Sequence, residues 1–135
     1  MLSGKGLLIC SGALISTRHF LTAAHCVMEY NDAEADEQCQ REKELRTLKL
    51  RFRDKTRMSV FIGSKCIYPE QCLNRRSVET FWFHKGWDPC TQAHDIAIVE
   101  LHENVVVGKE AAPICLPSRR LKLAPLLRAA GAGMN

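Results

Sequence analysis

Two stretches decide the fold of this chain: Leu21-Thr22-Ala23-Ala24-His25-Cys26 and His94-Asp95-Ile96-Ala97-Ile98-Val99-Glu100-Leu101. From Asp95 the second is a nearly unbroken apolar run of about seven residues, a length that favours a strand buried on both faces over a helix. An unpaired carboxylate at its head would cost about several kcal/mol, so Asp95 needs a hydrogen-bond donor. An imidazole N–H is a fitting donor, and the first stretch supplies one in His25.

A histidine that works as a general base needs a group that holds its ring and stabilises the imidazolium. A carboxylate on a rigid strand does this well. The small side chains before His25 allow a tight backbone turn, and Cys26 can fix the ring through a disulfide. Spacing alone leaves a structural role open, because a lone histidine beside a cysteine is often structural. Asp95 can equally be a turn or capping residue.

The exact strings favour the catalytic interpretation. CSGALIS at 10–16 and HFLTAAHC at 19–26 resemble the region around the catalytic histidine of trypsin-like serine proteases. HDIAIVEL at 94–101 resembles the catalytic-aspartate segment of that family, and FHKGW at 83–87 is similar to the loop before it. APICLP at 112–117 resembles the segment after the first barrel. Leu127–Gly133 resembles the strand that enters the second barrel, although Ala132 stands where a tryptophan is usual.

The resemblance implies a mainly β fold: the N-terminal antiparallel β-barrel of the trypsin-like fold, incomplete, with a helical insertion after the histidine segment. Residues 1–135 would form a partial protease domain without its second barrel. By resemblance, His25 is the general base and Asp95 orients it. The sequence holds no Gly-Asp-Ser-Gly-Gly segment for a nucleophile. We therefore expect a fragment of a secreted serine endopeptidase that is inactive by itself.

Two other functions remain open. The chain is alternatively a non-catalytic protease homologue that binds a partner. The third hypothesis is a zinc- or disulfide-stabilised binding module, for which Cys90-x3-His94 would supply two ligands, although nothing completes a set of four. We expect no cofactor and no metal. The expected partners are a protein or peptide substrate, with contacts to a propeptide or a second barrel.

Seven cysteines in 135 residues indicate a disulfide-bonded, extracellular protein. None forms a C-x-x-C motif, so a zinc ribbon is not predicted. By resemblance, Cys10 and Cys26 form the disulfide that brackets the base. By resemblance too, Cys115 is the cysteine that tethers the first barrel to a propeptide, which leaves it unpaired within this chain.

The other four cysteines are assigned on weaker grounds. Cys66 and Cys72 are a candidate pair that closes a local loop around Pro69. Cys39 with Cys90 is the pairing that is left.

Composition excludes several classes of protein. The hydrophobic fraction of 46% and charged fraction of 25% are typical of a globular domain, and the formal net charge is only +4. The basic runs Arg51–Arg57 and Arg119–Lys122 are interpreted as solvated surface, so nucleic-acid binding is not expected. No apolar run approaches the roughly 18–20 residues that span a membrane. Leu7–Cys10 is too short for a signal peptide.

About six short strands are expected, with one helix. The strands are predicted at Leu7–Ile15, His19–Thr22, Arg57–Ile62, Val78–Phe83 and Asp95–Leu101, with Leu126–Ala132 as a possible last one. The composition of Ala33–Lys49 predicts a surface helix or helical hairpin beside His25, supported by the ion pairs Glu37–Arg41 and Glu42–Arg46. The remaining histidines are expected to be structural: His19 and His102 exposed at strand ends or loops, and His84 in a loop.

Overall fold

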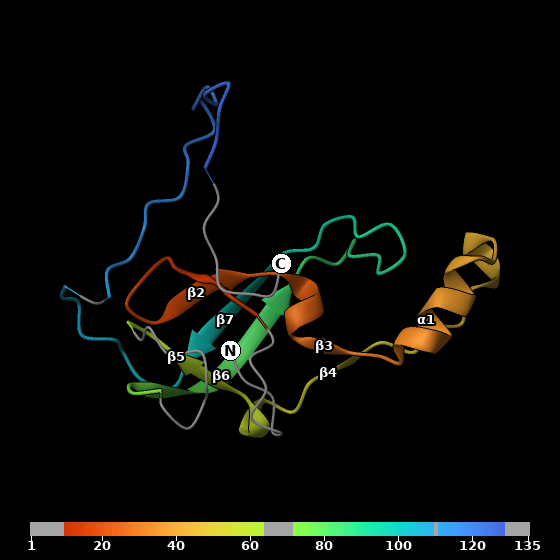
Figure 1. Cartoon of the computed structure of the whole chain (residues 1–135), viewed down its shortest axis with the longest axis horizontal. Coiled ribbons are helices and arrows are strands. Elements are labelled where there is room, and N and C mark those ends of the chain that lie inside the picture. Colours follow the sequence, from red (N-terminus) through yellow and green to blue (C-terminus); the bar gives the residue numbers. More distant parts are fainter. Residues whose placement is uncertain (1–9, 64–71, 110, 129–135) are drawn as a thin grey trace.

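A five-stranded antiparallel sheet lies at the centre of the fold and supplies six of the fourteen buried hydrophobic residues among those described (Figure 1). The computed structural model describes residues 10–63, 72–109 and 111–128. The strands of this sheet run in the order β1-β2-β7-β6-β5. Their bounds are Ala13–Leu14 (β1), His19–Thr22 (β2), Ser59–Phe61 (β5), Arg75–Phe83 (β6) and Ala97–Leu101 (β7). The predicted mainly β fold is confirmed, and no pairing closes β1 onto β5 among the described residues, as in an incomplete barrel.

The central strand β7 pairs with β2 on one side and β6 on the other. Thr22 at the end of β2 lies opposite Ala97 at the start of β7. On the other side the register shifts between Val78 and Thr80, which marks a β-bulge. This antiparallel register puts the residues that follow β2 beside those that precede β7.

Burial along β7 alternates, so the prediction of a strand buried on both faces is wrong. Val99 and Leu101 are fully buried, whereas Ile98 and Glu100 are only half-buried. Ile96, just before the strand, is 45% exposed. One face therefore packs into the core, where each buried aliphatic side chain contributes about 1.5–3 kcal/mol. The sequence does not show this alternation of burial, because apolar residues also occupy the more exposed face of this antiparallel strand.

The insertion after the histidine segment is built on a second, two-stranded sheet. β3 (Met28–Glu29) pairs with β4 (Arg51–Phe52), and α1 (Asp32–Cys39) stands out to one side between them (Figure 1). The Asn31 side chain caps α1 by accepting a 3.1 Å hydrogen bond from the backbone N–H of Glu34.

The predicted helix over Ala33–Lys49 is correct in type but too long. After α1 only a short 3₁₀ turn forms, at Lys43–Leu45. The Gln38 side chain accepts a 2.9 Å hydrogen bond from the backbone N–H of Thr47, which holds the returning chain against α1. The predicted Glu37–Arg41 ion pair is present at 2.7 Å.

Arg46 does not pair with Glu42 as predicted. Its guanidinium lies 3.6 Å from the carboxylate of Asp88, on the loop between β6 and β7. This ion pair and the Cys39–Cys90 disulfide join the insertion to that loop.

Other element predictions are partly confirmed. The His19–Thr22 strand is confirmed. The strand expected at Arg57–Ile62 is shorter, because a 3₁₀ turn occupies Lys55–Arg57, and the one expected at Val78–Phe83 begins earlier, at Arg75. Only Ala13–Leu14 of the first predicted strand is a strand, and residues 7–9 lie outside the described ones.

After β7 the chain first stays against the sheet, since Val105 is buried in the core and the backbone N–H of Ile114 donates to the carbonyl of Leu14 at 2.8 Å. The exposed segment that follows leads away from the sheet (Figure 1). Residues 126–128 form no strand, so that part of the predicted last strand is wrong, and residues 129–132 lie outside the described ones. In the part of the chain that the structure describes, no helix has the length and apolar character needed to cross a bilayer.

Candidate active site

Sheet register brings His25 and Asp95 together although 70 residues separate them. His25 lies in a 3₁₀ turn, Ala24–Cys26, which a single residue, Ala23, separates from β2. Asp95 lies two residues before β7, and β2 and β7 are antiparallel neighbours. The end of one strand thus delivers the histidine to the carboxylate that precedes the other.

The contact between the two residues has two points. The backbone N–H of His25 donates to Oδ1 of Asp95 at 2.9 Å, and ring Nδ1 lies 2.7 Å from Oδ2. Because an ionised carboxylate only accepts, Nδ1 carries the hydrogen and Nε2 keeps its lone pair when the ring is neutral. The His25 side chain is 52% exposed, and that of Asp95 is 25% exposed. The arrangement can therefore take up a proton at Nε2 while the carboxylate holds the ring.

Asp95 is kept ionised by its surroundings. Partial burial raises the pKa of its carboxyl group, but the hydrogen bonds from the backbone and ring of His25, the charge of His25 and the backbone N–H of Ala24 outweigh this effect. The net result is a pKa below the ordinary value. An ionised Asp95 is the form that can stabilise an imidazolium beside it.

A disulfide between Cys10 and Cys26 borders the His25 ring. Their Cα atoms lie 6.0 Å apart, within the expected range. The two sulfur atoms lie 3.8 and 3.5 Å from Nε2 of His25. These three side chains gather as metal ligands would. However, the cysteine ligands of zinc are thiolates, and the two sulfur atoms here are bonded to each other in the disulfide.

The remaining cysteines divide into three groups. Cys39 and Cys90 form a second disulfide with a Cα separation of 5.1 Å. Because Cys90 is bonded, the zinc hypothesis for Cys90-x3-His94 loses its thiolate. Cys72 is disulfide-bonded, but its predicted partner Cys66 lies outside the described residues. Cys115 is exposed and has no disulfide partner among the residues that the structure describes.

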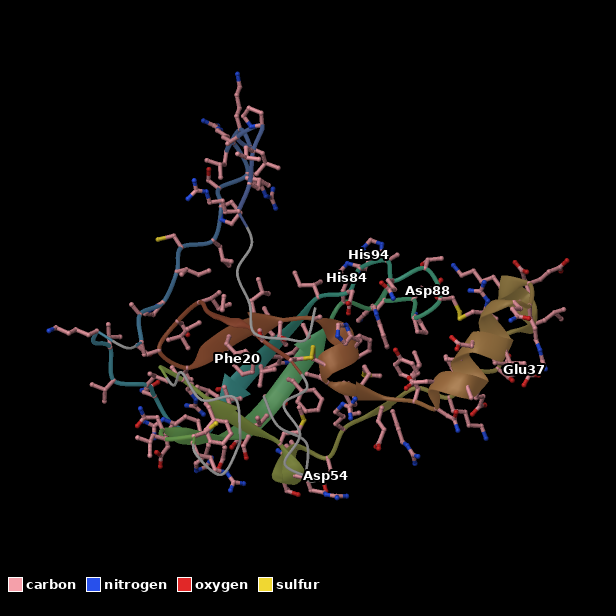
Figure 2. All side chains as sticks on the ribbon, viewed as in Figure 1. Phe20, Glu37, Asp54, His84, Asp88 and His94 are labelled. Atoms are coloured by element: carbon pink, nitrogen blue, oxygen red, sulfur yellow. A yellow bond between two sulfur atoms is a disulfide. The ribbon has the colours of Figure 1, made fainter. Side chains whose placement is uncertain are left out.

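The loop before Asp95 contains a feature that the sequence analysis missed. The rings of His84 and His94 stack with their centroids 4.3 Å apart (Figure 2). His94 has a positive φ of 56°, and a Cβ on Gly86 would lie 3.0 Å from its ring. The backbone N–H of His84 also donates to the carbonyl of Ile96 at 3.1 Å. These contacts hold the turn that presents Asp95. In the sequence, the glycine at position 86 of the His-x-Gly triplet is the signal that could have indicated this close packing.

The other two histidines are placed as follows. His19 is half-buried rather than exposed: its ring centroid lies 6.3 Å from that of Trp82, and its Nδ1 lies 2.9 Å from the hydroxyl of Ser16. His102 is exposed, as predicted, and its Nδ1 lies 2.7 Å from the carboxylate of Glu79. Neither contacts Asp95 in the described interactions.

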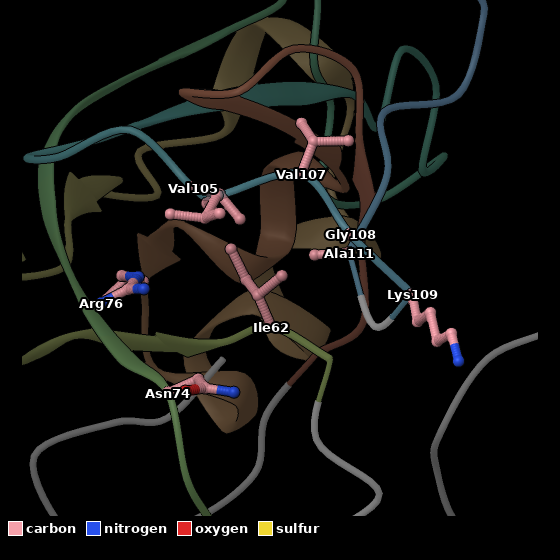
Figure 3. A pocket seen from close by; sticks show the side chains of 9 residues that line it. Ile62, Asn74, Arg76, Val105, Val107, Gly108, Lys109 and Ala111 are labelled. Carbon is pink, nitrogen blue, oxygen red and sulfur yellow. The ribbon is translucent and has the colours of Figure 1, made fainter.

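A separate hollow of about 260 Å³ lies at the opposite end of β7 (Figure 3). Ile62, Asn74 and Arg76 line one side of it, and residues 105–109 and 111 line the other. The Nε atom of Arg76 is buried there without a hydrogen-bond partner among the described residues. Neither His25 nor Asp95 lines this hollow, so it is not the cleft in which they would act.

Comparisons with known proteins identify a family and several relatives of this chain. The trypsin family model matches residues 1–134. Serine protease 7 of Drosophila melanogaster is 32% identical over 116 residues, which are 84% of this chain and 27% of that protein. The proclotting enzyme of Tachypleus tridentatus is 29% identical over 116 residues, 84% of this chain and 26% of that protein. The inactive serine protease PAMR1 of Homo sapiens is 26% identical over 123 residues, 87% of this chain and 14% of that protein. This chain therefore spans about a quarter or less of the length of these relatives.

Proposed function

Because this chain belongs to the trypsin family, we propose that it supplies the general base and the orienting carboxylate of a serine-type endopeptidase. His25 is the base and Asp95 the carboxylate. The observation that carries the proposal is the two-point contact of Asp95 with the backbone and ring of His25, at 2.9 and 2.7 Å. A single contact would fix the ring less well, because the imidazole could pivot about it.

In this reaction His25 Nε2 accepts the proton of a serine hydroxyl as the oxygen attacks the peptide carbonyl. Asp95 keeps the proton of the ring on Nδ1 and stabilises the imidazolium that forms. The imidazolium then gives its proton to the leaving amine. The serine and the oxyanion-hole donors are not supplied by any Gly-Asp-Ser-Gly-Gly segment of these 135 residues. They would belong to a second barrel.

We further propose that residues 1–135 form the first-barrel part of a protease domain that works outside the cell. The disulfides Cys10–Cys26 and Cys39–Cys90 support this location, because such bonds persist in oxidising compartments. In a full-length enzyme the substrate would be a protein or peptide.

A chimera tests the catalytic proposal. Residues 1–135 are joined to the second barrel of an active trypsin-family enzyme, and hydrolysis of a peptide ester and of casein is measured. We expect turnover that His25→Ala lowers by about 10⁴–10⁶-fold and Asp95→Asn by about 10⁴-fold. His102→Ala is the matched control and should leave turnover within about twofold.

Two results of this experiment would refute the proposal. One is turnover that survives His25→Ala. The other is a folded chimera with no activity. The 135 residues alone should hydrolyse neither substrate, because base and carboxylate without a nucleophile and oxyanion donors cannot form an acyl-enzyme.

A second candidate function is that of a non-catalytic homologue that binds a partner. The similarity to the inactive serine protease PAMR1 of Homo sapiens favours it. The transcript beyond Asn135 distinguishes the two functions. A Gly-Asp-Ser-Gly-Gly segment there supports the peptidase, and glycine in place of its serine supports the homologue.

A further inference from the structure

A surface pocket of about 330 Å³ lies where the insertion meets the loop between β6 and β7. Residues of the 43–50 segment form one wall, and Lys85–Cys90 forms the other. Asp88, on the second wall, lies on the side of the sheet that faces α1 (Figure 2). Neither His25 nor Asp95 lines the pocket. It is therefore distinct from the proposed catalytic pair.

The two walls are fixed to each other by a covalent bond and an ion pair. The Cys39–Cys90 disulfide joins the end of α1 to the second wall. The Arg46 guanidinium lies 3.6 Å from Asp88, and both side chains are only about one fifth exposed, at 21% and 19%. Arg46 Nε also donates to the carbonyl of Arg41 at 3.3 Å. The pocket is thus formed before any ligand arrives, which lowers the cost of ordering on binding.

The charges that line the pocket are unbalanced. Arg46 offsets Asp88, which leaves the exposed ammonium groups of Lys43 and Lys85 without an acidic counterpart in the lining. Glu42 and Glu44 flank Lys43 in the sequence but are not among the lining residues. Two cations at the rim of a concave surface, whose lining holds no carboxylate besides the paired Asp88, attract anionic groups.

The rest of the lining is largely apolar. Trp87 is 7% exposed and packs on Tyr30, with ring centroids 5.9 Å apart. Leu48, Leu50 and Pro89 add further apolar surface. A ligand that fits this lining has carboxylates close to an apolar side chain. An acidic polypeptide segment that contains leucine or a similar residue has this chemistry, whereas a small anion would leave the apolar surface unused.

We propose that this pocket binds an acidic segment of a polypeptide, whose carboxylates pair with Lys43 and Lys85 while an apolar side chain packs on Trp87. The inference rests on the proposed function only in taking the ligand to be a polypeptide. Gly86 lines the pocket, and a Cβ added to it would lie 3.0 Å from the ring of His94, the residue before Asp95. A segment bound here therefore lies against the loop between β6 and β7 that leads to Asp95.

The test uses the oxidised 135-residue chain and a fluorescein-labelled hexapeptide of alternating glutamate and leucine. Binding is followed by fluorescence anisotropy. The unlabelled peptide is then titrated into a Trp82→Phe background, where Trp87 is the remaining one of the two tryptophans. We expect saturable binding that weakens with salt and shifts the emission of Trp87. A peptide with glutamine for glutamate should bind at least about tenfold more weakly.

Charge reversal locates the site. Lys43→Glu with Lys85→Glu should weaken binding at least about tenfold, and the milder Lys43→Gln with Lys85→Gln at least about threefold. The matched control is Arg119→Glu with Lys122→Glu, which changes the charge equally in an exposed segment and should leave affinity within about twofold. Each variant is first shown by circular dichroism to fold like the parent chain. His25→Ala should also bind normally, so the result does not depend on the catalytic proposal.

Three outcomes would overturn the inference. Equal weakening by both charge-reversal pairs would mean non-specific attraction to a basic chain. Binding without a change in Trp87 emission would place the peptide elsewhere. Equal affinity for the glutamine peptide would remove the role of the carboxylates.

Discussion

Replacing Asp95 with asparagine keeps the shape of the side chain but removes its charge, and it should destabilise this chain by about 1.5 kcal/mol. The carboxylate accepts hydrogen bonds from both the backbone and the ring of His25. The amide oxygen of asparagine can keep one of them, and its NH₂ group faces the N–H of the ring. Hydrogen bonds to charged groups contribute about 1.5–3 kcal/mol. The lower value applies because the His25 side chain is 52% exposed.

Thermal unfolding measured by circular dichroism, with the disulfides intact, checks this value. For a chain of this length about 1.5 kcal/mol corresponds to a decrease in Tm of about 5 °C. Asp36→Asn is the matched control, because Asp36 is exposed on α1 and makes the same change of charge. Its Tm should fall by less than about 2 °C. Equal Tm values for the two variants would refute the argument from the hydrogen bonds.

The pH dependence of the difference in Tm between the parent chain and Asp95→Asn tests whether the carboxylate of Asp95 is ionised in the folded chain. Folding lowers the pKa of Asp95 below its ordinary value of 3.8. A group with a depressed pKa stabilises the fold above its unfolded pKa, and this contribution is lost as the pH falls through the folded pKa. The gap in Tm between the parent chain and Asp95→Asn should therefore be present at neutral pH and shrink in acid. A gap that does not shrink would contradict a stabilising charge at Asp95.

Three further predictions concern the core and the cysteines. Val99→Ala should lower the free energy of unfolding by roughly 2–3 kcal/mol in urea titrations, because Val99 is fully buried. Ile98→Ala on the half-buried face should cost less, and a larger loss there would mean that the faces of β7 are misassigned. Removing the Cys39–Cys90 disulfide, whose ends are 51 residues apart, should cost up to about 4 kcal/mol in the same assay, and an unchanged midpoint would show that it does not stabilise the fold. Unreduced protein should be alkylated at Cys115, and a peptide map that links Cys115 to another cysteine would contradict the scheme.

Some of the fold and the candidate site could be predicted from the sequence because the signals are local. Through the family resemblance, LTAAHC and HDIAIVEL predict His25 and Asp95 as the candidate pair, and the β-branched and aromatic runs indicate the strands. The start of α1 is also local, since Asn31 caps it with its own side chain. The prediction that Cys10 pairs with Cys26 rests on the family resemblance, because sequence spacing alone does not determine the pairing.

The sequence by itself determined which residues the candidate site contains, and the tertiary structure decided how they meet. The register of β2 against β7 sets the 2.7 Å contact across 70 residues. The end of α1 was also decided at a distance. Helix propensities differ by only a few tenths of a kcal/mol per residue for ordinary side chains. The Cys39–Cys90 disulfide and the contact of Arg46 with Asp88 accompany the early end of that helix. They also create the basic pocket, which no local pattern could reveal because its two walls lie about forty residues apart in the sequence.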